Sequence, residues 1–277
     1  MISICIPAYH AERYLGETMA SVRAQTHGDW ELIVVEDGSD DGTRALVECF
    51  AADVSQSVRY LRHEENRGLS ATRNAGFAAA RGEWIALLDA DDLWLPSHLA
   101  DLVAAAESAR THFAFASSQI FDSSTGVDGP LRAALPDQIR DPASALYRGE
   151  LVIQPSGVLF ARELLARHGG FDSRYAICND LEFWLRLAVG GERFAHTGCV
   201  TCRYRKHDAA MSRRSGELIA EVARIRRDYG RRVGLPAGQV RQLTAQAFWD
   251  AARIARRHNL ARSIRWGISG LFVRLVG

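Results

Sequence analysis

The sequence predicts an α/β protein whose central sheet is mostly parallel and flanked by helices. Apolar runs alternate with segments of helical periodicity through the first 110 residues, which is the pattern of successive βαβ units. The chain has 277 residues, of which 47% are hydrophobic and 24% charged. This composition is that of a globular protein large enough to bury a sizeable core, and it excludes the disordered, fibrous and coiled-coil classes.

Four short apolar runs predict buried strands in the first part of the chain. The runs cover residues 3–7, 30–35, 58–61 and 84–88. Helices are predicted between them over residues 11–25, 43–52 and 70–80. In parallel sheets, ligands bind beyond the carboxyl ends of the strands. Acidic residues follow two of these runs, and that placement favours a binding site over a purely structural turn.

The second part of the chain is less regular. The predicted elements are a helix over 93–110, a strand from Phe113, a loop or insert over 122–142, strand-like residues 151–160 and a helix over 180–189. Pro155-Ser-Gly157 interrupts the strand-like residues. Beyond about residue 217 the sequence predicts helix again.

Charge is distributed unevenly along the chain. Residues 217–277 hold twelve arginines and four acidic residues, a net charge of +8 within a chain whose total is +1. The first 216 residues therefore carry −7. The asymmetry predicts an acidic body and a basic helical extension that meets something anionic.

Several features point to a cytoplasmic protein. No apolar run reaches the ~18–20 residues that span a bilayer. The first residues lack a basic region and meet Pro7 early, unlike a secretory signal. The five cysteines are an odd number without framework spacing, which is typical of a reducing compartment. Cys199 and Cys202 are spaced like a zinc or redox pair, but no second pair accompanies them and packing explains them better. No nucleic-acid partner is expected.

The turn Asp89-Ala90-Asp91 follows the fourth apolar run. Two carboxylates at i and i+2 can hold a divalent cation, or one can hold the metal and the other a ribose. An isolated turn of this kind is also typical of a solvated loop. Asp92 adds a third acid, and Asp37 at the end of a neighbouring strand can reach the same crevice.

Four motifs together resemble the family 2 nucleotide-sugar glycosyltransferases of GT-A fold. They are SICIPAY at 3–9, ELIVVEDGS at 31–39, NRGLSATRNAG at 66–76 and LLDADD at 87–92. Residues 155–157 also resemble the glycine loop of that family, and Asn179-Asp180 resembles its acidic motif. The resemblance reaches about residue 210. It implies a GT-A domain over 1–216, with a nucleotide-binding half (1–110) and an acceptor-binding half (111–216), followed by the extension at 217–277.

The resemblance implies an inverting, metal-dependent glycosyltransferase that acts in cell-surface glycan biosynthesis. The implied cofactor is Mn²⁺ or Mg²⁺, the donor a UDP-, GDP- or TDP-linked sugar, and the acceptor a glycan or a lipid-linked sugar. A sugar nucleotidyltransferase and a catalytically inactive nucleotide-sugar-binding module are the alternatives. A nucleotidyltransferase would need a Gly-rich, basic N-terminal signature, which this sequence lacks. The intact acids at 37, 91 and 180 argue against an inactive binding module.

The resemblance also assigns roles at the donor site. Asp91 is expected at the metal and diphosphate, Asp89 nearer the ribose, and Asp37 at the base, where Tyr9 stacks. Arg73 is expected to reach the base or a phosphate, unless it lies on a solvated helix face. The nucleotide-sugar-binding residues expected are Pro7, Tyr9, Asp37, Arg73, Asp89, Ala90, Asp91 and Gly157.

Asp180 is the expected general base. At the start of a helix, the helix dipole would keep its carboxylate ionised and ready to accept a proton. The alternative is that Asn179 and Asp180 only cap this helix. His207 resembles a histidine that completes the metal site in relatives, although a lone histidine is commonly structural.

The sequence departs from the family pattern at three positions. His10 stands where Asn is usual, Glu36 where Asp is commoner, and Asn179-Asp180 where Glu-Asp is usual. These changes bear on donor preference more than on the reaction, because Asp37, Asp91 and Asp180 are present.

The last residues combine apolar side chains with arginines. The apolar ones are Ile264, Trp266, Ile268, Leu271, Phe272 and Leu275. A basic amphipathic helix of this kind can lie on the cytoplasmic face of a membrane. The alternative is an extension packed on the catalytic domain or across a homodimer.

Overall fold

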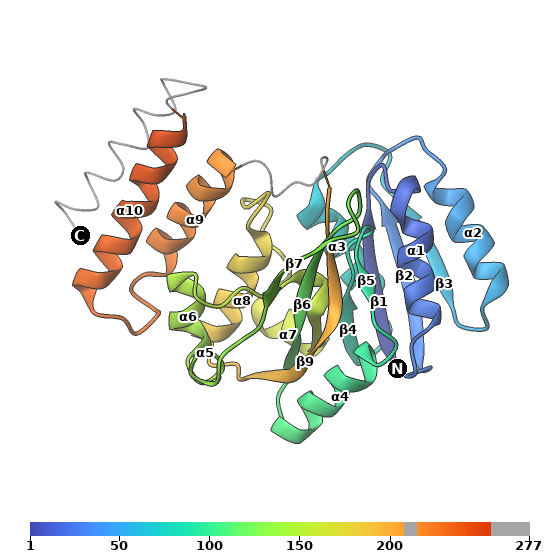
Figure 1. Cartoon of the computed structure of the whole chain (residues 1–277), viewed down its shortest axis with the longest axis horizontal. Coiled ribbons are helices and arrows are strands. Elements are labelled where there is room, and N and C mark those ends of the chain that lie inside the picture. The colour runs from blue at the N-terminus through green and yellow to red at the C-terminus, as the bar shows by residue number, and fades with distance from the viewer. Residues whose placement is uncertain (208–214, 256–277) are drawn as a thin grey trace.

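The computed structural model describes residues 1–207 and 215–255 and contains one mixed nine-stranded sheet with helices on both faces (Figure 1). The strands are β1 (Ile2–Ala8), β2 (Trp30–Glu36), β3 (Val58–Arg62), β4 (Trp84–Leu87), β5 (Leu93–Trp94), β6 (Phe113–Asp122), β7 (Asp128–Arg132), β8 (Val158–Ala161) and β9 (Phe194–Lys206). Their order is β3-β2-β1-β4-β8-β6-β9-β5, and β7 pairs with β6.

The prediction of a mostly parallel sheet is confirmed. The neighbours β3, β2, β1 and β4 are parallel throughout. Strand β8 is antiparallel to both β4 and β6, and β6 is parallel to β9. Among the described strands only β5, β7 and β8 therefore oppose the direction of β1.

The helices connect these strands across both faces. They are α1 (Glu12–Arg23), α2 (Thr43–Asp53), α3 (Leu69–Ala79), α4 (His98–Ala109), α5 (Pro136–Arg140), α6 (Pro142–Arg148), α7 (Glu163–His168), α8 (Asn179–Val189), α9 (Ser215–Tyr229) and α10 (Ala237–Ala255). A single 3₁₀ turn, η1, covers Pro155–Gly157. None of the described helices is long and apolar enough to cross a membrane.

Two hydrophobic cores lie on opposite faces of the sheet. All seven residues of β1 are buried, as expected for a strand covered on both sides. Ile4 and Ile6 belong to one core with Leu15 of α1, whereas Cys5 belongs to the other core with Phe77 of α3. This division follows from the alternation of side chains along a strand.

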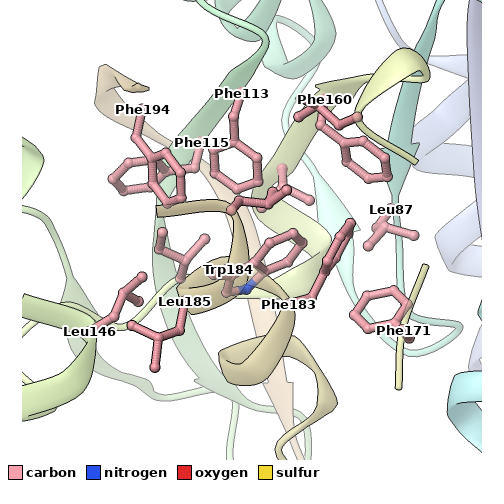
Figure 2. Close-up of a cluster of buried hydrophobic side chains, with 14 of the residues drawn as sticks. Leu87, Phe113, Phe115, Leu146, Phe160, Phe171, Phe183, Trp184, Leu185 and Phe194 are labelled. Carbon is pink, nitrogen blue, oxygen red and sulfur yellow. The ribbon is translucent and has the colours of Figure 1, made fainter. Parts of the chain in front are cut away.

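The second core holds α8 in place through an aromatic cluster (Figure 2). Trp184 contacts Phe113 of β6 with ring centroids 5.0 Å apart. Phe183 contacts Phe160 at 5.8 Å and Phe171 at 5.0 Å. Aromatic pairs of this geometry add to the free energy of burying the rings. The start of α8, which carries Asp180, is thereby fixed against the sheet.

Three predictions about secondary structure are wrong. Residues 93–94 form β5 on β9, and the helix begins only at His98 because Pro96 interrupts the segment. The predicted loop at 122–142 contains β7, which pairs with β6, and the short helix α5. Strand β8 begins at Val158, so residues 151–154 are irregular.

The predicted C-terminal helices are present as α9 and α10, and α9 packs on the body of the protein. Ile225 and Tyr229 belong to the same core as Phe183. The hydroxyl of Tyr147 donates to the main-chain oxygen of Arg226 at 2.9 Å. The packing alternative therefore describes residues 215–255. The terminal apolar segment lies outside the described residues.

Candidate functional site

A cleft of about 1020 Å³ opens at the carboxyl ends of β1 and β4. It brings together eight of the ten predicted site residues. These are Pro7, Tyr9, Arg73, Asp89, Ala90, Asp91, Asp180 and His207. The parallel strand order explains this convergence, because β1 and β4 are direct neighbours and their carboxyl ends share one edge.

The acidic turn after β4 is tied to α3 and to the end of β9 and is not a free solvated loop. Asp89 Oδ1 accepts a hydrogen bond from Arg73 Nη2 at 2.6 Å. Asp91 Oδ2 lies 2.7 Å from Nε2 of His207, at the end of β9. The side chains of Asp89 and Asp91 stay about a quarter to a third exposed, at 26% and 33%, so both are accessible from the cleft.

Asp92 is the buried acid of this turn and bonds it to neighbouring segments. Its side chain is buried and accepts from Ser156 Oγ at 2.5 Å and from the Arg205 amide at 2.8 Å. Burial, with the neighbouring charges of Asp91 and Asp89, raises the pKa of Asp92 well above its usual value. Sequence reasoning noted the third acid but assigned it no role. The structure makes Asp92 a link between the acidic turn, η1 and β9.

Gly157 lies behind the cleft and does not line it. A Cβ at this position would lie 3.3 Å from the main-chain oxygen of Ala116 in β6. The preceding Ser156 bonds to both sides of the acidic turn, because its hydroxyl also accepts from the Asp89 amide at 3.0 Å. The resemblance placed Gly157 at the nucleotide sugar, and in the structure it lets η1 approach β6 closely.

Arg73 bridges the acidic turn and α8. Its Nη1 donates to Asn179 Oδ1 at 2.8 Å, and its Nη2 donates to Asp89. Its guanidinium lies 5.1 Å from the centroid of the Phe171 ring. The residue is 2% exposed, which excludes a solvated helix face. Asn179, one of the departures from the family pattern, is thus the uncharged partner of Arg73.

Asp180 lies at the first turn of α8 and lines the cleft. Its Oδ1 accepts from the Leu181 amide at 2.7 Å. Burial raises the pKa of Asp180, although the charge of Arg73 and the hydrogen bond from Leu181 lower it. Desolvation therefore outweighs the contributions that lower this pKa, and the expectation that the helix dipole keeps the carboxylate ionised stays a prediction. A raised pKa makes the carboxylate a better proton acceptor once it is ionised.

The capping alternative fits the start of α8 only in part, because Asp180 itself accepts from the Leu181 amide of the first turn. Cys178 occupies the N-cap position, and no side chain caps the helix there. The amide of Asn179 is engaged with Arg73 and donates to Ser70 Oγ at 3.1 Å.

Replacing Arg73 is expected to change the pH dependence of turnover. Arg73 lowers the pKa of Asp180, so Arg73→Gln raises that pKa further. Since a base must be ionised, the acidic limb of kcat moves to higher pH in the variant. Measuring kcat against pH at saturating donor checks this. Arg73→Lys keeps the charge and is the control; an equal shift in both variants would contradict the electrostatic account.

Asp37 is buried at the end of β2 and lies outside the cleft lining. Its carboxylate accepts from the amides of Arg67 at 2.8 Å and Gly68 at 2.9 Å, and it contacts His63 Nδ1 at 2.9 Å. Burial raises its pKa, but these hydrogen bonds outweigh burial and the pKa is lowered. Asp37 thus fixes the loop before α3, and its contact with a nucleobase stays a prediction.

Tyr9 presents an aromatic face at the mouth of the cleft. It follows β1, lines the cleft and is 52% exposed, so its ring is accessible to a ligand. The neighbouring His10 has a φ of 50°, in the left-handed region that few side chains adopt. The exposed ring fits the expected stacking role.

Residues that sequence reasoning missed line the rest of the cleft. Arg132 of β7 and Lys206 of β9 add positive charge. The Arg132 guanidinium lies 5.5 Å from the centroid of the Tyr204 ring. The opposite wall is apolar and includes Trp184, Leu218 and Val222. No signal in the sequence joined these segments, since α9 and β7 reach the cleft only through tertiary packing.

Asp91 and His207 have the chemistry of a metal site that is completed by its ligand. The carboxylate oxygen of Asp91 suits Mg²⁺ or Mn²⁺, whereas the imidazole nitrogen of His207 is a donor more typical of softer transition metals. No group of three or more His, Cys, Asp or Glu side chains able to hold a metal occurs in residues 1–207 and 215–255. The donors fit a cation whose other ligands are phosphate oxygens and water, as is usual for Mg²⁺ at diphosphates.

The two cysteines of the 199–202 pair do not converge. Cys199 is exposed and Cys202 is buried. All five cysteines are free. Packing, and not zinc binding, accounts for Cys202.

Comparison with known proteins agrees with this geometry. Residues 3–169 match the sequence model of Glycosyl transferase family 2. A Bacillus subtilis (strain 168) protein named as a glycosyltransferase, EpsE, is 26% identical over 264 residues, covering 93% of this chain and 92% of its own. An Escherichia coli relative, the UDP-Glc:alpha-D-GlcNAc-diphosphoundecaprenol beta-1,3-glucosyltransferase WfgD, is 36% identical over 99 residues. That match covers 36% of this chain and only 38% of WfgD.

Solved structures share the fold. TarS 1–349 of S. aureus in complex with UDP-GlcNAc superimposes with a TM-score of 0.72 at 16% identity, covering 98% of this chain and 81% of the TarS 1–349 chain. The mannosyltransferase PcManGT of Pyrobaculum calidifontis, with GDP-Man and Mn²⁺, gives 0.67 at 18% identity, covering 99% and 81%. The fold and the relatives define a GT-A glycosyltransferase, which is an enzyme. The chain belongs to Glycosyl transferase family 2.

Proposed function

We propose that the protein is an inverting, metal-dependent glycosyltransferase that moves a sugar from a nucleoside diphosphate sugar to an acceptor hydroxyl. The observation that carries this proposal is the arrangement of one cleft. The acidic turn with His207 lies on one side and Asp180 lies on the other, and Arg73 connects the two sides.

The acidic turn is the site proposed for the donor diphosphate. A divalent cation at Asp91 and His207 would supply positive charge to the leaving diphosphate. Asp89 is proposed to contact the ribose, and Tyr9 the nucleobase, whose aromatic face suits stacking. Pro7 and Ala90 line the cleft between these groups. Solved relatives bind UDP-GlcNAc and GDP-Man, which supports a nucleoside diphosphate sugar of this general kind.

Asp180 is proposed to accept the proton of the acceptor hydroxyl. As the hydroxyl oxygen forms its bond to the anomeric carbon, the bond from that carbon to the diphosphate oxygen breaks. The proton moves to the Asp180 carboxylate, and the electron pair leaves with the diphosphate. A single displacement of this kind inverts the anomeric configuration, and it needs no carboxylate nucleophile.

The acceptor is proposed to be a glycan or lipid-linked sugar of a cell-surface polysaccharide. The name of the E. coli relative specifies a diphosphoundecaprenol-linked acceptor. The cleft of this chain combines an apolar wall on α8 and α9 with the cations Arg132 and Lys206. In a lipid-linked acceptor, the apolar lipid would suit the apolar wall, and the diphosphate would suit the two cations.

A panel of nucleotide sugars tests the proposed reaction without knowledge of the acceptor. Purified protein is mixed with UDP-, GDP- and TDP-linked sugars, with Mn²⁺, Mg²⁺ or EDTA. We expect one nucleotide class to raise the Tm and one donor to be hydrolysed slowly, both only with metal. Binding without turnover, with any acceptor extract added, would indicate an inactive binding module. Turnover of a nucleoside triphosphate with a sugar phosphate would indicate a nucleotidyltransferase.

Peripheral contact with the cytoplasmic face of a membrane is proposed for residues 261–277, called the tail here. We expect the full chain to co-sediment with anionic liposomes at low salt and to be released at high salt, because each arginine near an anionic surface contributes ~1 kcal/mol. A version ending at residue 260 keeps α9 and α10 and is the control. Equal recovery of both proteins in the supernatant at low salt would show that the tail does not bind membranes.

A further inference from the structure

Glu221 of α9 reaches across to the loop that leads into α8. Its Oε1 accepts from the Ala176 amide at 2.9 Å. Its Oε2 accepts from the amides of Ile177 at 2.9 Å and Cys178 at 2.8 Å. The residue is 5% exposed, so three consecutive main-chain donors share one buried carboxylate from another part of the chain.

Of the three amides, that of Cys178 lies at the N-cap of α8, and those of Ala176 and Ile177 lie in the loop before the helix. Helix N-termini leave main-chain N–H groups without partners, and a side chain usually satisfies some of them. Here Cys178 at the N-cap makes no such bond. Glu221 pairs the donors just before the first helical residue, and a negative charge there is favourable for the helix dipole.

The same loop is anchored to α9 on both sides of the Glu221 contacts. The hydroxyl of Tyr175 donates to Asp228 Oδ2 at 2.8 Å. The thiol of Cys178 donates to the Leu218 main-chain oxygen at 3.6 Å. Asp180 follows Cys178 by two residues, so the main chain held by Glu221 sets the direction in which the chain enters α8 and the Asp180 carboxylate points.

We propose that Glu221 is a positioning residue, through which the C-terminal extension orients the general base. This inference rests on the proposed function of Asp180 and adds a role for a helix that no family motif includes. The catalytic site is then incomplete in residues 1–216 alone, because the group that fixes Asp180 comes from beyond them.

A double-mutant cycle in the full chain tests the proposal. Glu221→Gln keeps the shape of the side chain but replaces one acceptor oxygen with a donor, which leaves at least one amide unpaired. We expect kcat to fall about 10- to 100-fold, the scale of misplacing a reacting group by ~1 Å, with the donor KM within about twofold of wild type. In the Asp180→Asn background the same change should leave the residual rate nearly unaltered, since it acts through Asp180.

Thr244→Val of α10 is the matched control. It removes a buried hydroxyl that bonds Tyr147 at 2.9 Å, so it destabilises the extension without touching residues 176–178. We expect it to lower Tm and leave kcat unchanged. An equal loss of rate from Glu221→Gln in both backgrounds, or a loss of rate that follows Tm in both variants, would show that Glu221 is only structural.

Amide hydrogen exchange separates failure of this proposal from failure of the proposed function. We expect Glu221→Gln to speed exchange at 176–178, whether or not a donor has been identified. Unchanged exchange at these amides would show that Glu221 does not hold residues 176–178. Faster exchange with wild-type kcat would overturn its catalytic role. Absence of any wild-type turnover would instead overturn the assignment of Asp180, and the positioning role with it.

Discussion

Asp180→Asn is expected to lower kcat by ~10²–10⁴-fold, the usual contribution of a general base, while the donor KM changes little. The amide has nearly the shape of the carboxylate but cannot take the acceptor proton. Steady-state kinetics with a saturating donor measure this effect. Asp172→Asn is the matched control, since Asp172 lies in the preceding loop and pairs with the exposed Arg174.

The stability of this variant distinguishes a base from a helix cap. Burial raises the pKa of Asp180 in the folded protein, so ionising it costs free energy, and stability is lost as pH rises from the unfolded-chain value through the folded one. At pH 7, Asp180→Asn should therefore keep or raise Tm. A variant with a normal rate and a lowered Tm would mean that Asp180 supports the helix and not the reaction.

Asp91→Ala is expected to abolish transfer and to remove the metal dependence of nucleotide binding. The carboxylate lies 2.7 Å from His207, and it is the proposed anchor of the cation that neutralises the diphosphate. Thermal stabilisation by nucleotide, with and without Mn²⁺, measures the loss of binding, and a donor-turnover assay measures the loss of rate.

Asp40→Ala provides the comparison for Asp91. Asp40 is an exposed carboxylate in the turn after β2, where it pairs with Arg62, so its loss changes the charge but not the cleft. We expect Mn²⁺ to stabilise the nucleotide complex of Asp40→Ala as it does that of the wild type. Substantial metal-dependent turnover by Asp91→Ala would exclude Asp91 as the metal anchor.

Local signals in the sequence were sufficient for the first half of the fold. The strand predictions at 3–7, 30–35 and 58–61 match β1, β2 and β3 within one or two residues. A buried parallel strand needs a continuous apolar run, and each run is bounded by turn residues, so the pattern is readable without tertiary information. The second half failed where pairing partners are distant, as for β5 and β9.

For the site, too, local sequence signals were sufficient for some residues, and others depend on distant partners. Short motifs placed Asp89, Asp91 and Asp180, because acids at strand ends and helix starts are visible in sequence. The roles of Asp92 and Glu221 were not visible. Each role depends on hydrogen-bond partners more than 40 residues away. Local sequence does not show which carboxylates become buried against such partners.

The sequence by itself therefore determined the succession of strands and helices in the first half of the chain, the acidic turn and the family. Only the tertiary structure decided which carboxylates face the cleft, that Asp37 and Gly157 lie behind it, and that α9 of the extension holds the loop before Asp180. The physical reason is that periodicity and turn residues act over a few positions along the chain. Desolvation, hydrogen-bond pairing and charge depend on which distant segments fold against one another.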